Sequence, residues 1–316
     1  MPQLVSTLLL ALADATLERL RADPDPVEGV RDPCLVALVN ATALRARVNA
    51  ISAAGGHRAA FQLCAPLPNL PFSPALHLLE GASEPAVLAD IWQRLEAAWR
   101  IRNRTAIRRE GSSALVLHCQ PYRGTSAPTS QNMMICGALH ALMQGLGYVG
   151  LCVSVRSPSG PWRQLVSDDR WCCSLPGLEP DAAVFRIGWL AASASRPRPR
   201  ELAHLDRCSD EPAVSACLTA MSKQPERNWT PRRLAELTGR SLRTFNRRLQ
   251  AQNLTAGTLI RRARMRAACL RLGTSSQPLT DIAHELGFSD SAHLSRAVHQ
   301  AAGVTPTAYR ELARMR

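Results

Sequence analysis

The last third of the chain has a regular pattern of apolar positions and helix boundaries that predicts helices throughout. Thr230 followed by proline is typical of a helix start, because threonine caps unpaired amide groups and proline is tolerated at the first helical position. We expect a helix over 231–238 that ends at Gly239. Ser241 then caps a second helix over 242–251. The predicted inward positions of this pair are Leu234, Leu237, Phe245 and Leu249.

The same arrangement recurs further along the chain. A helix over 279–286 is expected to end at Gly287, and a turn at Phe288–Ser289 leads into a helix over 290–301. The inward positions of this last helix are Leu294 and Val298. Between the two pairs we expect one long basic helix over 256–272, with an apolar side made of Leu259, Ile260, Ala263, Ala267 and Leu270. Two helix pairs joined by one helix are a more specific pattern than a single helical hairpin.

The first two thirds of the chain mix helical periods with short segments typical of strands. Residues 85–101 have the clearest helical period, and Gly111 to Ser113 between two apolar stretches predict a hairpin. The expected elements are helices over 3–21, 85–101 and 132–146, and strands over Thr105–Glu110, Ala114–Cys119, Val149–Val155 and Ala183–Leu190.

A serine-, proline- and arginine-rich stretch separates these two patterns. It occupies residues 191–200, where no regular element is expected. We therefore predict an α+β domain over 1–190, a linker over 191–206 and an all-α domain over 207–316. The α+β part has no internal repeat and no phosphate-loop or dinucleotide-binding motif.

The net charge of +13 is concentrated in the predicted all-α domain. Residues 207–316 carry 18 basic and 8 acidic residues, a net of +10, whereas residues 1–206 carry 20 and 17, a net of +3. Such an excess is typical of a domain that binds a polyanion, although a basic solvated surface is the alternative. No stretch approaches the ~18–20 apolar residues of a membrane span, and no basic residue precedes Arg19 as a signal peptide requires. We expect a cytoplasmic protein.

The ten cysteines do not form a metal-binding or redox motif in the sequence. None is part of a C-x-x-C pair, and most lie in apolar runs, where cysteine behaves as a small buried hydrophobe. The adjacent Cys172 and Cys173 are the exception, with packing favoured over a redox or soft-metal role. We expect no metal and no cofactor.

The C-terminal pattern resembles the DNA-binding region of AraC/XylS transcription regulators. The run Leu234-Ala-Glu-Leu-Thr-Gly-Arg-Ser-Leu-Arg-Thr-Phe-Asn-Arg-Arg-Leu249 is similar to the first helix-turn-helix of that family. Ile282-Ala-His-Glu-Leu-Gly-Phe-Ser-Asp-Ser-Ala-His-Leu-Ser-Arg296 and Gly303-Val-Thr-Pro-Thr-Ala-Tyr-Arg310 resemble its signature region. Three positions depart from the family pattern: Leu294 and Val298 stand where Phe is usual, and His299 where Arg or Lys is common. The last change is expected to remove one phosphate contact.

The resemblance implies two recognition helices that read adjacent major-groove turns of double-stranded DNA. With Phe245 and Leu249 facing inward, the outward DNA-binding candidates on the first are Arg243, Thr244, Asn246, Arg247 and Arg248. Arginine can bind guanine and asparagine can bind adenine with two hydrogen bonds, so Arg243, Asn246 and Arg247 are the predicted base readers and Arg248 a phosphate contact. The second helix offers Ser291, Ala292, His293, Ser295 and Arg296. Four arginines of the connecting helix are further candidates: Arg261, Arg262, Arg264 and Arg266. Each is expected either to contact phosphate or to lie on a solvated face or form an ion pair with Asp281 or Glu285.

For the N-terminal domain the resemblance implies sensing of a small molecule, dimerisation, or both. Residues 85–190 resemble the sensor domain of the ornithine-utilisation type of AraC regulator, which has a helix, a hairpin, a helix and further strands in this order, whereas the first 80 residues match it poorly. The apolar stripe of the helix over 85–101 or 132–146 has two interpretations. It either forms a homodimer surface or, more simply, faces the core of the domain. The polar and aromatic ligand-binding candidates are His118, Tyr122, Arg123, His140, Tyr148 and Trp162.

The whole chain is therefore interpreted as a dimeric transcription activator, not an enzyme, that contacts DNA and RNA polymerase under control of a small-molecule effector. Two alternatives remain. One is a cysteine-based redox- or alkylation-responsive regulator, or a DNA-repair methyl acceptor, which needs an activated thiol. The other is a regulator controlled by a partner protein.

Overall fold

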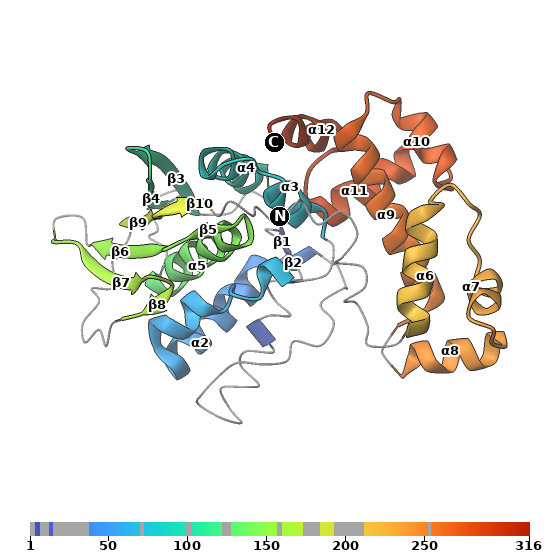
Figure 1. The fold of residues 1–316 in the computed structure, drawn as a ribbon, viewed down its shortest axis with the longest axis horizontal. Helices are drawn as coiled ribbons and strands as arrows, with labels where there is room; N and C mark the ends of the chain where they lie inside the picture. Colours follow the sequence, from blue (N-terminus) through green and yellow to red (C-terminus); the bar gives the residue numbers. More distant parts are fainter. Residues whose placement is uncertain are drawn as a thin grey trace. The chain divides into compact units, whose positions relative to one another are not determined.

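The structure of the protein is a computed structural model that describes residues 4–6, 13–14, 38–69, 73–98, 103–121, 128–156, 160–172, 184–192, 212–251 and 254–316. The chain divides into two compact units. The N-terminal unit comprises residues 1–70, 79–198 and 315–316, and the C-terminal unit comprises residues 71–78 and 199–314. Figure 1 traces both units along the chain.

The N-terminal unit is built on a six-stranded antiparallel sheet (Figure 1). The predicted hairpin is confirmed: Glu110 pairs with Ala114 around Gly111, which has a φ of +63°. The order across the sheet is β3-β4-β9-β6-β7-β8. These strands are β3 (Asn103–Glu110), β4 (Ala114–Pro121), β6 (Cys152–Arg156), β7 (Arg163–Ser167), β8 (Arg170–Trp171) and β9 (Val184–Gly188).

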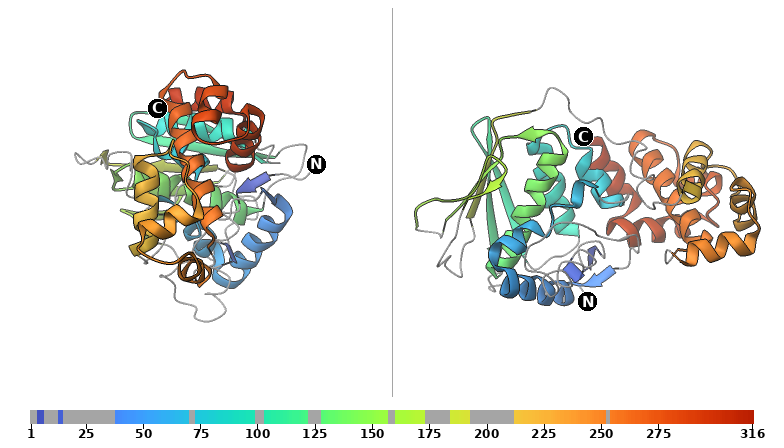
Figure 2. Two further views of the ribbon diagram at one scale, coloured as in Figure 1. Left: turned by 90° about the vertical axis from the view of Figure 1, so that its right-hand side faces the viewer. Right: turned by 60° about the horizontal axis from the view of Figure 1, so that its bottom comes forward.

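Helices pack around this sheet and provide most of the unit's core. α5 (Thr129–Gly145) lies beside the sheet with α2 (Ala41–Gln62) against it (Figure 2), while α4 (Pro85–Ala98) packs on β3. Gly137 allows the close approach of α2 and α5, because a Cβ there would collide with the carbonyl oxygen of Phe61. The 3-10 helix η1 (Leu67–Asn69) follows α2. Both α4 and α5 bury their apolar positions in this core. This agrees with the simpler interpretation of the predicted helices over 85–101 and 132–146, in which their apolar stripes face the core and not a dimer partner.

Three expectations for the N-terminal part are wrong in detail. Leu4–Ser6 is not helical but forms β1, which pairs with β2 (Leu38–Asn40); Ala13 and Asp14 are helical, and the rest of 3–21 lies outside the described residues. The strand predicted over 149–155 is broken at Gly150, whose φ is +65°, into β5 (Tyr148–Val149) and β6. The start of the predicted linker is also a strand, because β10 (Ala191–Ala192) pairs with β5.

The C-terminal unit is helical, as predicted. Its helices are α6 (Pro212–Lys223), α7 (Pro231–Leu237), α8 (Leu242–Gln250), α9 (Ala256–Thr274), α10 (Leu279–Glu285), α11 (Ser291–Ala302) and α12 (Pro306–Arg314). Residues 71–78, which include most of α3 (Pro74–Glu80), also belong to this unit. Tyr309 of α12 is fully buried, and its hydroxyl donates to the Pro74 carbonyl at 3.2 Å.

The cores under the two helix pairs largely match the predicted inward positions. Leu234, Phe245 and Leu249 are buried in one cluster with residues of α6 and the start of α9. Leu237 is the exception, since its side chain is 47% exposed at the end of α7. α6, which covers this cluster, was not among the predicted helices.

None of the described helices is long and apolar enough to cross a membrane.

Candidate nucleic-acid interface

The sequence closes the turn between α7 and α8 by capping and by a left-handed glycine. The Thr230 hydroxyl accepts from the Arg233 amide at 3.3 Å at the start of α7, and Ser241 accepts from the Thr244 amide at 3.3 Å at the start of α8. Gly239 between them has a φ of +65°, which L side chains rarely adopt. Both predicted caps are therefore confirmed, and they fix where α8 begins.

The outward face of α8 is strongly basic. With Phe245 and Leu249 buried, the four long polar candidates are exposed: Arg243, Asn246, Arg247 and Arg248. Thr244 is half-buried instead, because its hydroxyl and amide both bond to Ser241 at the helix start. The exposed face thus offers guanidinium and amide groups that can form paired hydrogen bonds with guanine and adenine.

The second helix pair has the same local construction. The Asp290 carboxylate accepts from the His293 amide at 2.6 Å and caps α11, and Gly287 has a φ of +73° in the preceding turn. Hydrogen bonds from His293 and Ser289 lower the pKa of Asp290, so its cap stays charged at neutral pH. Leu294 and Val298 are fully buried, so the aliphatic residues found where the related family has Phe still fill this core.

The outward face of α11 offers fewer long donors than α8. Ala292, His293 and Arg296 are exposed, whereas Ser291 and Ser295 are half-buried. The Ser295 hydroxyl donates to the Ser291 carbonyl at 2.8 Å, which leaves its oxygen only as an acceptor. The His293 ring is held by Ser289, with its Nδ1 3.1 Å from the Ser289 hydroxyl.

The arginines of α9 separate into structural and exposed groups. Arg264 donates to the Gly287 carbonyl at 3.0 Å and so braces the turn between α10 and α11. Arg266 is buried and Arg262 half-buried, which leaves Arg261 as the exposed member of the predicted set. One predicted alternative was an ion pair between these arginines and Glu285. Glu285 instead pairs with Arg271, a later arginine of α9.

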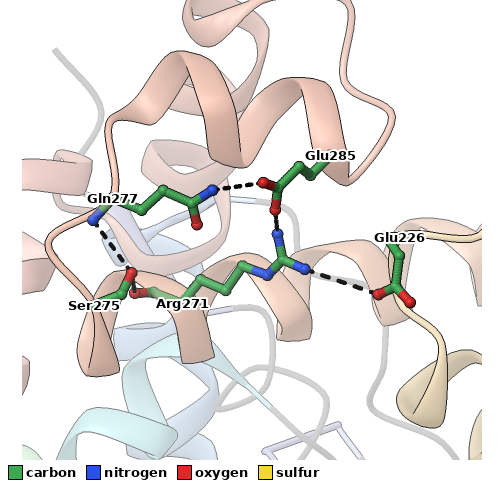
Figure 3. Close-up of polar contacts among 5 residues, drawn as sticks. All are labelled: Glu226, Arg271, Ser275, Gln277 and Glu285. Carbon is green, nitrogen blue, oxygen red and sulfur yellow. Dashed lines mark hydrogen bonds and ion pairs between the residues drawn. The ribbon is translucent and has the colours of Figure 1, made fainter.

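Arg271 was not singled out by sequence reasoning (Figure 3). It pairs with Glu285 of α10 and lies 3.8 Å from Glu226, in the loop after α6. Gln277 donates to the same Glu285 at 2.8 Å. The network ties the end of α9 to both neighbouring segments. Its side chains are partly exposed, so its role is to fix geometry more than to add stability.

The buried cysteines do not provide the activated thiol that a repair or redox reading requires. Burial raises the pKa of Cys64 to about 12 and that of Cys217 to about 11, and it raises the pKa of Cys119 and Cys136 as well. Such thiols remain protonated and poorly reactive at neutral pH. Cys172 is exposed, and Cys173 lies outside the described residues. Among the described side chains no cluster of three or more His, Cys, Asp or Glu could hold a metal ion.

The polar candidates of the N-terminal unit do not converge on one place. Tyr148 is buried against Trp189, with ring centroids 5.6 Å apart, and Trp162 is 38% exposed beneath the Arg156 guanidinium. His118 is half-buried on β4. Tyr122 and Arg123 lie outside the described residues. Two of the described candidates line pockets, but different ones: Tyr148 lines a pocket with Trp189, and His140 lines another with side chains that the sequence did not identify.

Comparison with known proteins assigns the C-terminal unit to a class. Residues 234–312 match the family model described as "Helix-turn-helix domain". This match spans α7 to α12, including both helix pairs and the helix that joins them. Residues 234–312 are therefore a helix-turn-helix domain.

The relatives found by sequence agree with this class. One, described as an AraC-like transcription regulator of Streptomyces antibioticus, is 30% identical over 120 residues, or 34% of this chain and 39% of that protein. Another of the same description, from Streptomyces lividans, is 31% identical over 103 residues, or 32% of this chain and 34% of that protein. An uncharacterised helix-turn-helix regulator of Haemophilus influenzae is 28% identical over 99 residues, or 31% and 33%. The chain thus matches well under half the length of these relatives.

Two solved structures are similar at a TM-score of 0.32 each. One is a DNA-binding transcriptional dual regulator from Escherichia coli K-12, with 19% identity, covering 34% of this chain and 98% of that one. The other is the transcriptional regulator CdpR from Pseudomonas aeruginosa, with 14% identity, covering 95% of this chain and 98% of that one.

Proposed function

We propose that this protein is a transcription regulator that binds double-stranded DNA through two helix-turn-helix units, α7–α8 and α10–α11. The observation that carries the proposal is the exposed basic face of α8, set on a capped helix within a domain that matches a helix-turn-helix family. Such a face suits both the phosphate backbone and the base edges of a major groove.

The length of α9 supports a two-site arrangement. Its 19 residues, at about 1.5 Å each, extend for about 28 Å. Successive major-groove faces on one side of B-DNA are about 34 Å apart, so a rigid helix of this length suits the separation of two recognition helices. Arg271 and Arg264 favour rigidity, because they tie α9 to the second helix pair.

The two recognition helices are proposed to contribute unequally. Arg243, Asn246 and Arg247 of α8 would read bases and Arg248 would contact phosphate. Of the predicted α11 candidates, His293 and Arg296 combine exposure with a donor group long enough to reach a base, so this helix would discriminate less among sequences. Ser291, Ser295 and Thr244 would add short contacts.

The N-terminal unit is proposed to sense a small molecule and to mediate homodimer formation. An effector bound there would change the affinity for DNA or the contact with RNA polymerase, and activation is the proposed outcome. Support comes from the sequence resemblance to family sensor domains and from a pocket within this unit. Burial keeps the Cys64 and Cys136 thiols protonated, which disfavours these two as the thiol of a redox switch.

Retention of genomic DNA tests the proposed function. The purified full chain is mixed with sheared DNA from its source organism, and the retained fragments are sequenced. We expect enriched sites that contain two short motifs about one helical turn apart. Retention of random fragments alone would show a basic surface without sequence reading, and the proposal would then be wrong.

A further inference from the structure

A small pocket in the N-terminal unit brings together a carboxylate and three aromatic rings. Its volume is about 180 Å³, and its lining comes from α2, α5 and the β7–β8 hairpin, which lie next to one another in Figure 1. The Phe61 ring centroid lies 5.2 Å from that of His140 and 5.6 Å from that of Trp171. The His140 and Trp171 ring planes are tilted by 58° and 54° to that of Phe61, so both rings pack against it. At roughly 30 Å³ for one water molecule, the space suits only a small ligand.

The carboxylate belongs to Asp169, which lies in a tight two-residue turn. Asp168 and Asp169 form the two-residue loop between β7 and β8, closed by the pairing of Ser167 with Arg170. Their φ values are 49° and 62°, in the region where such loops favour Asn-Gly or Asp-Gly. Gln144 donates to the Asp169 carboxylate at 2.9 Å. The turn and the Gln144 hydrogen bond together hold the Asp169 carboxylate at the pocket.

His140 leaves an unsatisfied polar atom in the same lining. Its side chain is buried, and its Nε2 lies 3.6 Å from the Asp169 carboxylate, too far for a hydrogen bond. Within the described part of the chain this nitrogen has no hydrogen-bond partner. Burial lowers the pKa of His140 to about 4, against the opposing charge of Asp169, so the ring is neutral at pH 7. Asp169 is the one acidic side chain in the described lining.

We propose that this pocket binds a small organic cation that carries no carboxylate group. Asp169 supplies the counter-charge, and Phe61 and Trp171 line the same pocket with aromatic rings, whose quadrupoles attract cations. Because no lysine or arginine is among the described lining residues, an acidic group on the ligand would meet Asp169 without a partner. The inference rests on the proposed function, in which the N-terminal unit senses a small molecule, and it names the chemical class of that molecule.

Three probes of nearly equal shape test the class directly. Calorimetric titration of the full chain uses choline as the cation, 3,3-dimethylbutan-1-ol as its uncharged isostere, and glycine betaine as a cation with a carboxylate. We expect choline to bind and each of the other two to bind at least about tenfold more weakly. Equal binding of choline and its uncharged isostere, preferential binding of glycine betaine, or binding of none would overturn the proposal.

Two neighbouring substitutions assign the effect to one carboxylate. Asp169→Asn preserves the shape, the tolerance of positive φ and an oxygen acceptor for Gln144, but it removes the charge. Asp168→Asn is the matched control, since it removes the same charge from the adjacent turn residue, which does not line the pocket. With folding checked by circular dichroism, choline affinity should fall at least about tenfold in D169N and stay at the parent value in D168N. Equal affinity in both variants would refute the role of Asp169.

The same proteins separate this inference from the proposed function. DNA retention is measured on the full chain without any probe and again in the presence of choline. Specific retention of DNA with no charge-selective binding of choline would leave the regulator proposal standing and reject the cation pocket. Charge-selective binding of choline with no specific retention of DNA in either condition would support the pocket and reject the regulator.

Discussion

Replacing Tyr309 with Phe removes one oxygen atom from the core of the C-terminal unit. Tyr309 is 0% exposed, and its hydroxyl donates at 3.2 Å to the carbonyl of Pro74, a residue 235 positions earlier in the chain. Pro74 is also buried, but it begins α3, so its carbonyl keeps the intrahelical hydrogen bond with the amide four residues later. Losing the second of its two donors costs about 0.5–1.5 kcal/mol, the net value of one hydrogen bond. The substitution therefore measures how firmly residues 71–78 are held in this unit.

Hydrogen exchange followed by mass spectrometry resolves this effect by region in the full chain. A loss of about 0.5–1.5 kcal/mol in the free energy of local opening corresponds to exchange about 2- to 12-fold faster. We expect this acceleration in peptides from Pro306–Arg314 and from the described part of 71–78 in Y309F, and none in peptides from β4. Tyr148→Phe, which removes a hydroxyl from the N-terminal unit, is the matched control. Unchanged exchange in α12 of Y309F would refute the reasoning.

Three further outcomes follow from the described contacts. Arg247→Ala should weaken specific DNA binding by about 1–3 kcal/mol and relax one base preference in a binding titration. Arg314→Ala removes the same charge at an exposed position of α12 and should not have this effect. Gly137→Ala should lower the free energy of unfolding, measured by urea titration, by about 1–3 kcal/mol, because the added Cβ collides with the Phe61 carbonyl. Stability equal to that of the parent would contradict this and show that α2 and α5 can move apart to accommodate the methyl group. The pKa of Asp290 is lower in the folded protein than its value of about 4 in the unfolded chain. The Asp290 carboxylate therefore contributes its full stability above about pH 4, and this contribution is lost as the pH falls through the folded pKa. Acid-induced unfolding of the parent should show this loss, and that of D290N should not.

Local chemistry made the C-terminal helices predictable from the sequence. The caps at Thr230 and Ser241 and the break at Gly239 act over three or four residues, so the sequence contains nearly all the information that sets these helix ends. The buried partners Phe245 and Leu249 follow from the helical period alone. Leu237 was placed wrongly because it lies in the last turn of α7, where the period no longer decides burial.

Long-range pairing could not be predicted in the same way. Leu4–Ser6 is a strand because it pairs with Leu38–Asn40, and an apolar run near it also fits a helical period. The break at Gly150 depends on Ala191 and Ala192 pairing with β5 from the far end of the unit. No local pattern reports a partner that is tens of residues away.

The candidate site shows the same division. The exposed arginines of α8 followed from which positions of that helix are apolar. Arg271 and Asp169 were missed because their roles depend on residues brought close only by the fold, Glu285 and His140. A signal for Asp169 was present in the two-residue Asp-Asp stretch between short apolar runs, which is a hairpin pattern.

The central claim is that both helix pairs bind one DNA site together. The most direct test is the affinity of the full chain for a retained site, measured before and after five base pairs are inserted between its two motifs. Five base pairs are about half a helical turn, so the insertion moves one motif to the opposite face of the duplex. We expect the affinity to fall to that of a single motif. Unchanged affinity would contradict simultaneous binding by α8 and α11.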